Sequence, residues 1–175
     1  MTRLVLVLVL AAGALLALSL AARVCAQTPA PSRGCTTDVA HQFDFWVGDW
    51  NVYDPHGVLE GTNTVTLEYG TCVVHEHWNG VAGDQGESLN FFYHPTGKWH
   101  QTWVSNGGFL FLDGGMVGKA MVLTGTRTAK AGKRMDRISY TPGPDGSVRQ
   151  VWDVSTDGGK TWTNTFDGNY VRKPG

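Results

Sequence analysis

Hydrophobic and polar residues alternate along most of the chain after about residue 45. Short runs rich in Val, Thr, Phe, Tyr and Trp are separated by turn signals such as DPHG, GVAGDQG, HPTGK and PGPDG. Alternation of this kind is typical of half-buried strands, and regularly spaced turns are typical of antiparallel barrels. The pattern predicts about ten strands: Trp46–Asp54, Val58–Glu68, Thr71–Asn79, Glu87–His94, Lys98–Ser105, Phe109–Leu112, Met116–Arg127, Lys133–Thr141, Ser147–Ser155 and Thr161–Arg172.

Helical signals are confined to the segment before the first strand. Residues 36–45 (TTDVAHQFDF) predict at most one short helical turn, with Thr37 or Asp38 as its N-cap. The predicted fold is therefore all-β. We expect residues 41–175 to form a single antiparallel up-and-down β-barrel domain.

The N-terminus has the pattern of an export signal. Arg3 precedes the uncharged apolar run Leu4–Ala22, and small residues follow up to Ala26. We predict a signal peptide over residues 1–26 and a flexible Pro/Ser/Thr-rich linker over residues 27–40. An uncleaved anchor is the alternative, because the apolar run is long. The predicted location is periplasmic or extracellular.

The net charge limits the classes of partner that we expect, and the cysteines indicate the redox compartment. Without residues 1–26 the chain keeps 12 basic and 15 acidic residues, a net charge of −3. No basic patch stands out, so we expect neither nucleic acid nor a membrane surface as a partner. Cys35 and Cys72 remain, and in an exported protein they most simply form one disulfide. The alternative is a free Cys35 and a buried Cys72.

The first predicted strand contains a Gly-x-Trp pattern. Gly48 and Trp50 share one face of the strand with Trp46 and Val52, since side chains alternate. Lipocalin-like barrels use this arrangement to close one end of the barrel, and they usually set an arginine of the last strand against the tryptophan. Arg172 is the candidate here, by cation–π stacking.

Several segments together resemble a known family. FDFWVGDWNVYDPHG, the C-x-x-x-E-x-W of residues 72–78, ESLNFFYHPTGKWHQTWVSNGG and the closing STDGGKTW…NYVR are similar to a family of exported bacterial lipocalin-like proteins within the calycin group. The resemblance extends from about Phe43 to Arg172. It implies a barrel fold and no particular activity.

One parity of the central strands combines aromatic and polar residues. A small barrel filled by packing alone would prefer Val, Ile and Leu inside. Polar groups converging on apolar walls are instead typical of a small-molecule pocket. The candidate ligand-binding residues are Glu76, Trp78, Ser88, Asn90, Trp99, Gln101, Trp103, Gln150 and Trp152.

Two other interpretations of this set stay open. The polar groups could form a satisfied internal network that only sets strand register, or a shift of one residue would move all of them to solvent. Within the set, Glu76 is the one candidate for an acid or base, because burial among aromatic rings raises the pKa of a carboxyl group. The commoner role of such a residue is structural.

The remaining motifs argue against metal, haem and nucleophile chemistry. His75 and His77 share a face, but the preferred alternation turns them outward, and no third ligand or HExxH spacing is evident. Nitrobindin-like calycin barrels hold haem through a histidine late in the chain, whereas the last histidine here is His100. There is no Gly-x-Ser-x-Gly elbow. We therefore expect no metal and no cofactor.

The segment STDGGKTW, residues 155–162, matches the Asp-box of sialidases. Asp157 can accept backbone N–H bonds across a turn, two glycines supply positive φ, and Trp162 can pack on the hairpin. One copy contains no carboxylate pair at glycosidase spacing. We interpret it as a hairpin marker and not as a glycosidase site.

These observations lead to three functional hypotheses. The first is an exported lipocalin-like protein, monomeric or weakly dimeric, that binds a small, partly apolar molecule inside the barrel. The second is an isomerase- or hydrolase-like enzyme that uses Glu76 as general acid or base. The third is a cavity-free structural or interaction module of the envelope. The presence of a cavity faced by Glu76 favours the first two.

Overall fold

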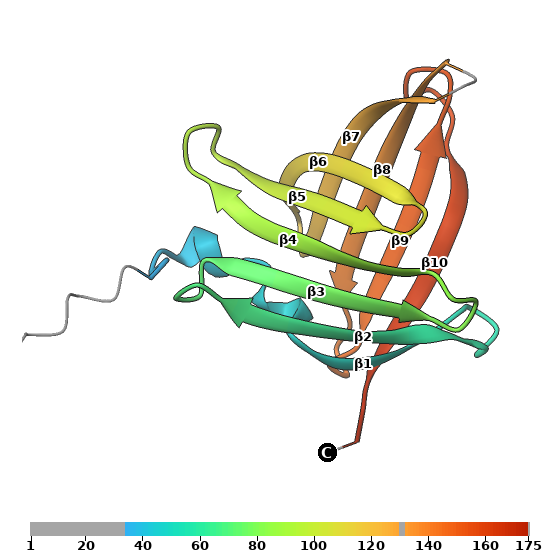
Figure 1. Cartoon of the computed structure of the whole chain (residues 1–175). Coiled ribbons are helices and arrows are strands. Elements are labelled where there is room, and N and C mark those ends of the chain that lie inside the picture. Colours follow the sequence, from blue (N-terminus) through green and yellow to red (C-terminus); the bar gives the residue numbers. More distant parts are fainter. Residues whose placement is uncertain (1–33, 130–131, 175) are drawn as a thin grey trace, which may run out of the picture. The chain divides into compact units, whose positions relative to one another are not determined.

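The computed structural model describes residues 34–129 and 132–174, which form a closed antiparallel barrel of ten strands (Figure 1). Each strand pairs with its neighbours in chain order, and β1 closes the barrel by pairing with β10. The predicted fold class is confirmed. The strands are β1 (Gly48–Tyr53), β2 (Leu59–Glu68), β3 (Val73–Gly80), β4 (Gln85–Tyr93), β5 (Lys98–Ser105), β6 (Gly108–Val117), β7 (Ala120–Ala129), β8 (Gly132–Pro142), β9 (Val148–Ser155) and β10 (Thr163–Arg172).

Two short 3-10 helices precede the barrel, η1 (Asp38–His41) and η2 (Asp44–Trp46). The alternation predicted that the first strand begins at Trp46. Trp46 instead ends the helix η2, and the strand begins at Gly48. The last residues of the predicted linker belong to the folded part, since Ala40 is buried and Cys35 is disulfide-bonded. The predicted signal peptide lies outside the described residues. None of the described helices has the length and apolar character needed to cross a membrane.

The sixth strand is longer than the sequence pattern predicted. LDGG was interpreted as a turn, but β6 continues through it to Val117, and the turn falls at Gly118, which has a φ of 60°. Gly114 instead allows two strands to approach each other. A Cβ atom at this position would lie 1.9 Å from the carbonyl oxygen of Val122 on β7.

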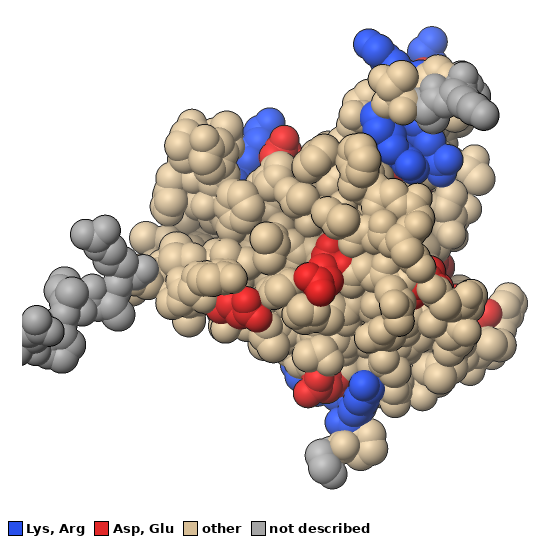
Figure 2. All heavy atoms as spheres, in the orientation of Figure 1, with Lys and Arg blue, Asp and Glu red and all other residues tan. Residues whose placement is uncertain are grey.

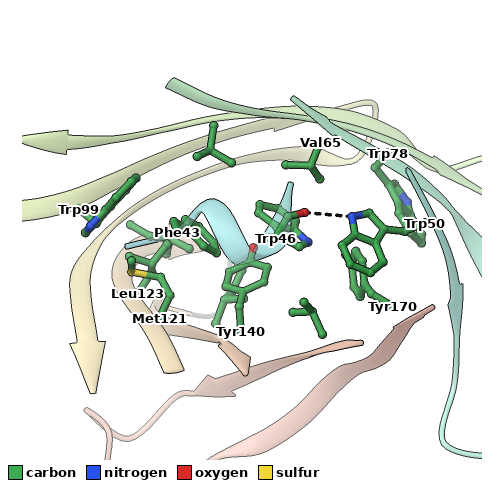
Figure 3. Close-up of a cluster of buried hydrophobic side chains, with 14 of the residues drawn as sticks. Phe43, Trp46, Trp50, Val65, Trp78, Trp99, Met121, Leu123, Tyr140 and Tyr170 are labelled. Carbon is green, nitrogen blue, oxygen red and sulfur yellow. Dashed lines mark hydrogen bonds between the residues drawn. The ribbon is translucent and has the colours of Figure 1, made fainter. Parts of the chain in front are cut away.

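Aromatic side chains fill the end of the barrel next to the helices (Figure 3). Phe43 and Trp46 are fully buried, with their rings stacked 5.0 Å apart. The Trp46 ring lies 4.5 Å from that of Tyr140, and the Trp46 carbonyl accepts a 2.9 Å hydrogen bond from the indole N–H of Trp50. The helices thus plug this end.

The Gly-x-Trp strand and the last strand meet as the pattern predicted. The guanidinium of Arg172 lies 4.4 Å over the Trp50 ring and donates to the carbonyl of Val47. Gly48 makes room for it, because a Cβ atom there would lie 2.3 Å from an Arg172 nitrogen. A cation–π contact therefore joins β1 to β10.

The predicted Cys35–Cys72 disulfide is confirmed, with Cα atoms 4.9 Å apart. It ties the segment before η1 to the turn between β2 and β3. Within that turn, Tyr69 and Thr71 have left-handed φ angles of 50° and 67°. The amide of Cys35 donates to the carbonyl of Gly70 at 3.2 Å, so the N-terminal segment also braces this turn.

The STDGGKTW segment forms the hairpin between β9 and β10. Asp157 accepts hydrogen bonds from the amides of Lys160 and Thr161 and from the hydroxyl groups of Ser155 and Thr161, at 2.6–3.0 Å. These donors hold the pKa of its carboxyl group well below the usual range. Trp162 donates from its indole to the Gly159 carbonyl. The motif is fully accounted for by the turn.

Candidate functional site

The inward parity of the central strands carries the predicted polar residues. Glu76 on β3, Ser88 and Asn90 on β4, Gln101 on β5 and Gln150 on β9 are each at most 9% exposed. The register aligns Glu76 with Ser88, and Asn90 with Gln101, across neighbouring strands. Successive side chains along a strand point alternately into and out of the barrel. All five residues are at inward-pointing positions of their strands.

These residues form a hydrogen-bonded chain centred on Glu76. Its Oε1 accepts from Asn63 at 2.7 Å, and its Oε2 accepts from the Ser88 hydroxyl at 2.6 Å. Asn90 donates to Ser88 at 2.9 Å and accepts from Gln101 at 2.7 Å. Both carboxylate oxygens of Glu76 thus have a donor.

Two tyrosines extend the chain to the far wall. Gln101 donates to the Tyr140 hydroxyl at 3.0 Å, and Asn63 donates to the Tyr170 hydroxyl at 3.3 Å. Tyr170 in turn donates to Gln150 in a short contact. The network therefore crosses the interior from β2–β5 to β8–β10.

Burial changes the proton affinity of Glu76. Desolvation raises the pKa of its carboxyl group to about 7, against the opposing effect of the Ser88 and Asn63 hydrogen bonds. Burial, together with the nearby Glu76 charge, also raises the pKa of Tyr140 and Tyr170 well above 10. Near neutral pH the carboxyl group thus lies between its two protonation states, and both phenols stay protonated.

A cavity of about 100 Å³ lies against this network. Its polar side is formed by Glu76, Gln101, Gln150 and the two tyrosines, and its apolar walls are mainly aromatic. The lining residues are Glu76, Trp78, Asp84, Gln101, Trp103, Ile138, Tyr140, Gln150, Trp152, Phe166 and Tyr170. Polar groups and aromatic walls therefore meet at one place, as a small-molecule site requires.

Six of the nine predicted ligand-binding residues line the cavity: Glu76, Trp78, Gln101, Trp103, Gln150 and Trp152. The other three are not among its lining residues. Ser88 and Asn90 are hydrogen-bonded to Glu76 and Gln101 and support them. Trp99 lies with the aromatic plug, 5.7 Å from the Phe43 ring.

Sequence reasoning missed the walls contributed by β8 and β10. Ile138 and Tyr140 alternate on β8, and Phe166 and Tyr170 share a parity on β10, so the same period-two rule could have found them. Asn63 on β2 has the same signal. Asp84 does not, because it lies in the turn between β3 and β4.

Glycines keep two of the indoles against the wall. A Cβ atom at Gly86 would lie 2.5 Å from the Trp103 ring, and one at Gly61 would lie 2.6 Å from the Trp78 ring. Each ring therefore packs against the neighbouring strand at a position where a side chain would collide with it.

Two carboxylates anchor tryptophans of the cavity wall. Asp84 accepts a 2.6 Å hydrogen bond from the Trp78 indole. Asp136, which is 1% exposed, accepts from the Trp152 indole at 2.9 Å and from Arg127 through two bonds of 2.7 and 3.1 Å. These contacts fix the orientation of both tryptophans.

A second hollow of about 230 Å³ adjoins the cavity. The two share Asp84, Trp103 and Trp152, and the outer hollow is further lined by Leu110 and Arg127. The two hollows therefore have part of their walls in common.

One residue that lines the cavity has a buried polar atom without a partner. The side-chain Oε1 of Gln101 is buried and accepts no hydrogen bond from the described residues. A buried acceptor left unpaired costs about 1–3 kcal/mol.

None of the residues that line the cavity is a histidine. His75 and His77 lie on the outer face, as their parity predicted, with 15% and 41% of their side chains exposed.

Comparison with protein-family models and with curated proteins yields no match to this chain.

Proposed function

We propose that this protein is an exported, lipocalin-like binding protein that holds a small, partly apolar molecule inside the barrel. The observation that carries the proposal is the cavity, where aromatic walls meet the buried polar side chains of Glu76, Gln101 and Gln150. Export is supported by the Cys35–Cys72 disulfide, since such bonds persist in oxidising compartments.

The size of the cavity limits the ligand. An apolar cavity of about 150 Å³ holds benzene, and drug-sized ligands need about 300–1,000 Å³. At about 100 Å³ this cavity suits only a few non-hydrogen atoms. We propose that a compact head group with an N–H or O–H donor enters it, and that any apolar remainder lies between Trp103 and Trp152 in the outer hollow.

Native mass spectrometry of untagged protein, purified from its own envelope, tests this proposal. We expect a bound species that is released on denaturation. Ile138→Trp, which fills the cavity, should remove it, whereas Val117→Trp at a 66% exposed position should not. Repeated preparations of the unmodified protein without a bound species, and without a saturable change in tryptophan fluorescence on titration with small amphiphiles, would overturn the proposal.

A second candidate is an enzyme in which Glu76 acts as general acid or base. Its place in the cavity wall and its pKa of about 7 favour this role. The two donors on its carboxylate favour a structural role instead. Incubation of the co-purified ligand with fresh protein distinguishes them. An enzyme releases a product and loses that activity in Glu76→Gln, whereas a binding protein returns the ligand unchanged.

A further inference from the structure

A mixed cluster of histidines and carboxylates lies on the outer face of β2, β3 and β4. His75 and His77 project outward because Glu76 and Trp78 project inward. Their ring centroids are 4.0 Å apart. Figure 2 shows acidic but no basic side chains on the surface over β3 and β4. The cluster is therefore open to a cation.

The strand register supplies the carboxylates. His77 pairs with Glu87 on β4, and His75 pairs with Thr66 on β2, two residues from Glu68 on the same face. The Nδ1 atom of His75 lies 3.1 Å from Oε2 of Glu68. Glu68 is a third candidate ligand that the sequence spacing did not reveal, because it comes from a different strand.

The ligand atoms are close to the spacing that one metal ion requires. One ligand atom each from Glu68, His75 and His77 lie within 4.8 Å of one another. A tetrahedral zinc ion with bonds of about 2.0–2.2 Å holds its ligand atoms roughly 3.3–3.6 Å apart. Small side-chain rotations therefore suffice to close the set around an ion.

One of these atoms is a buried nitrogen without a hydrogen bond. His75 Nδ1 has no hydrogen-bond partner among the described residues, although the Glu68 carboxylate lies 3.1 Å away. At 3.1 Å these two atoms can share a proton or a cation, and a bound metal ion would take the place of the proton.

Glu87 occupies the other side of the two rings. Its Oε2 lies 3.4 Å from His75 Nε2, and its Oε1 lies 3.3 Å from His77 Nδ1. One nitrogen of each ring thus faces this carboxylate, which leaves the other nitrogen for an ion. Carboxylates in this position orient metal-binding histidines and increase their basicity.

We propose that Glu68, His75 and His77 bind a divalent transition-metal ion of the zinc class on the outside of the barrel, with Glu87 positioning both histidines. Two imidazoles and one carboxylate leave a fourth position for water or another donor. This site is separate from the cavity, so it stands or falls independently of the proposed ligand.

Isothermal titration calorimetry of Zn²⁺ into untagged full-length protein tests the site. We expect one saturable site, an affinity loss of at least about 100-fold in His75→Ala and His77→Ala, and a loss of about 10- to 100-fold in Glu87→Gln. His100→Ala is the matched control. His100 also lies beside an outer-face carboxylate, 2.9 Å from Asp113. The His100→Ala variant should bind zinc with the same affinity as the unmodified protein.

Circular dichroism establishes that each variant is folded, and Co²⁺ absorption reports the coordination directly. We expect tetrahedral-type visible bands in the unmodified protein and their loss in His77→Ala. Absence of saturable zinc binding, or binding that His75→Ala and His100→Ala weaken equally, would overturn the proposal.

Discussion

Glu76 is a carboxyl group that folding removes from water while supplying it with two donors. Desolvation exceeds the effect of the Asn63 and Ser88 hydrogen bonds, so its pKa rises from 4.5 to about 7. Below pH 4.5 both the folded and the unfolded states are protonated there. As the pH rises to about 7, the unfolded state loses this proton and the folded state keeps it, so stability decreases.

We predict that replacing Glu76 with Gln removes this pH dependence. Between pH 4 and pH 8 the unmodified protein should lose about 3 kcal/mol of unfolding free energy relative to Glu76→Gln. Of the groups nearby, Tyr140 and Tyr170 stay neutral in this range, and His75 is common to both proteins. Urea unfolding in EDTA at several pH values measures the difference. Parallel pH profiles of the two proteins would contradict it.

At the residue scale, glycine also controls the cavity. We predict that Gly86→Ala moves the Trp103 ring into the cavity and costs about 1–3 kcal/mol, because its Cβ would lie 2.5 Å from the ring. Gly115→Ala, whose Cβ has nothing within 4 Å, is the matched control and should change stability by less than about 0.5 kcal/mol. Tryptophan fluorescence and urea unfolding measure both effects, and equal behaviour of the two variants would refute the role of Gly86.

Among the elements, the β9–β10 hairpin depends on one side chain. The Asp157 carboxylate accepts hydrogen bonds from Ser155, Lys160 and Thr161. Without this carboxylate, these three donors in the turn lose their acceptor. We predict a lower melting temperature for Asp157→Ala, with a smaller decrease for Asp157→Asn, which keeps one acceptor oxygen. Hydrogen exchange should show faster exchange at the amides of Lys160 and Thr161. Unchanged exchange at both amides would mean that the glycines alone form the turn.

The elements were predictable wherever a period of two governs them. Glu76, Gln101 and Gln150 lie inside because side chains alternate along a strand, and that rule needs no tertiary information. The prediction of a turn at LDGG was wrong because a glycine can allow two strands to approach closely as well as allow a turn. Gly114 has the first role, and Gly118 has the second.

The rest of the site depends on how distant segments meet, which local periodicity does not contain. Phe43 and Trp46 decide which end of the barrel is filled, and they enter it from the segment that contains the short helices η1 and η2. Glu68 joins His75 and His77 through the β2–β3 register. Asp84 reaches the rim from a turn. Parity therefore predicts which residues face inward, and tertiary structure decides which of them line free space.

At the scale of the whole molecule, the Cys35–Cys72 disulfide holds the plug in the barrel. The disulfide closes a loop of 37 residues that contains η1, η2, β1 and β2. Cross-linking a loop of this length reduces the entropy of the unfolded chain and stabilises the fold by about 4 kcal/mol in the chain-entropy model. Phe43 and Trp46 lie within this loop, so opening it loosens the segment that fills one end.

We therefore predict that the Cys35→Ser, Cys72→Ser double variant loses about 4 kcal/mol of unfolding free energy. The unmodified protein in dithiothreitol should lose a similar amount, and the double variant should not respond to the reductant, which controls for its other effects. Urea unfolding followed by the fluorescence of the buried tryptophans gives both values.

Phe43→Ala removes an aromatic side chain of the plug. If the plug depends on the disulfide, the losses of unfolding free energy caused by Phe43→Ala and by the double cysteine variant should not add when the changes are combined, because both act on the same segment. Strictly additive losses would show that the plug is held by its aromatic contacts alone.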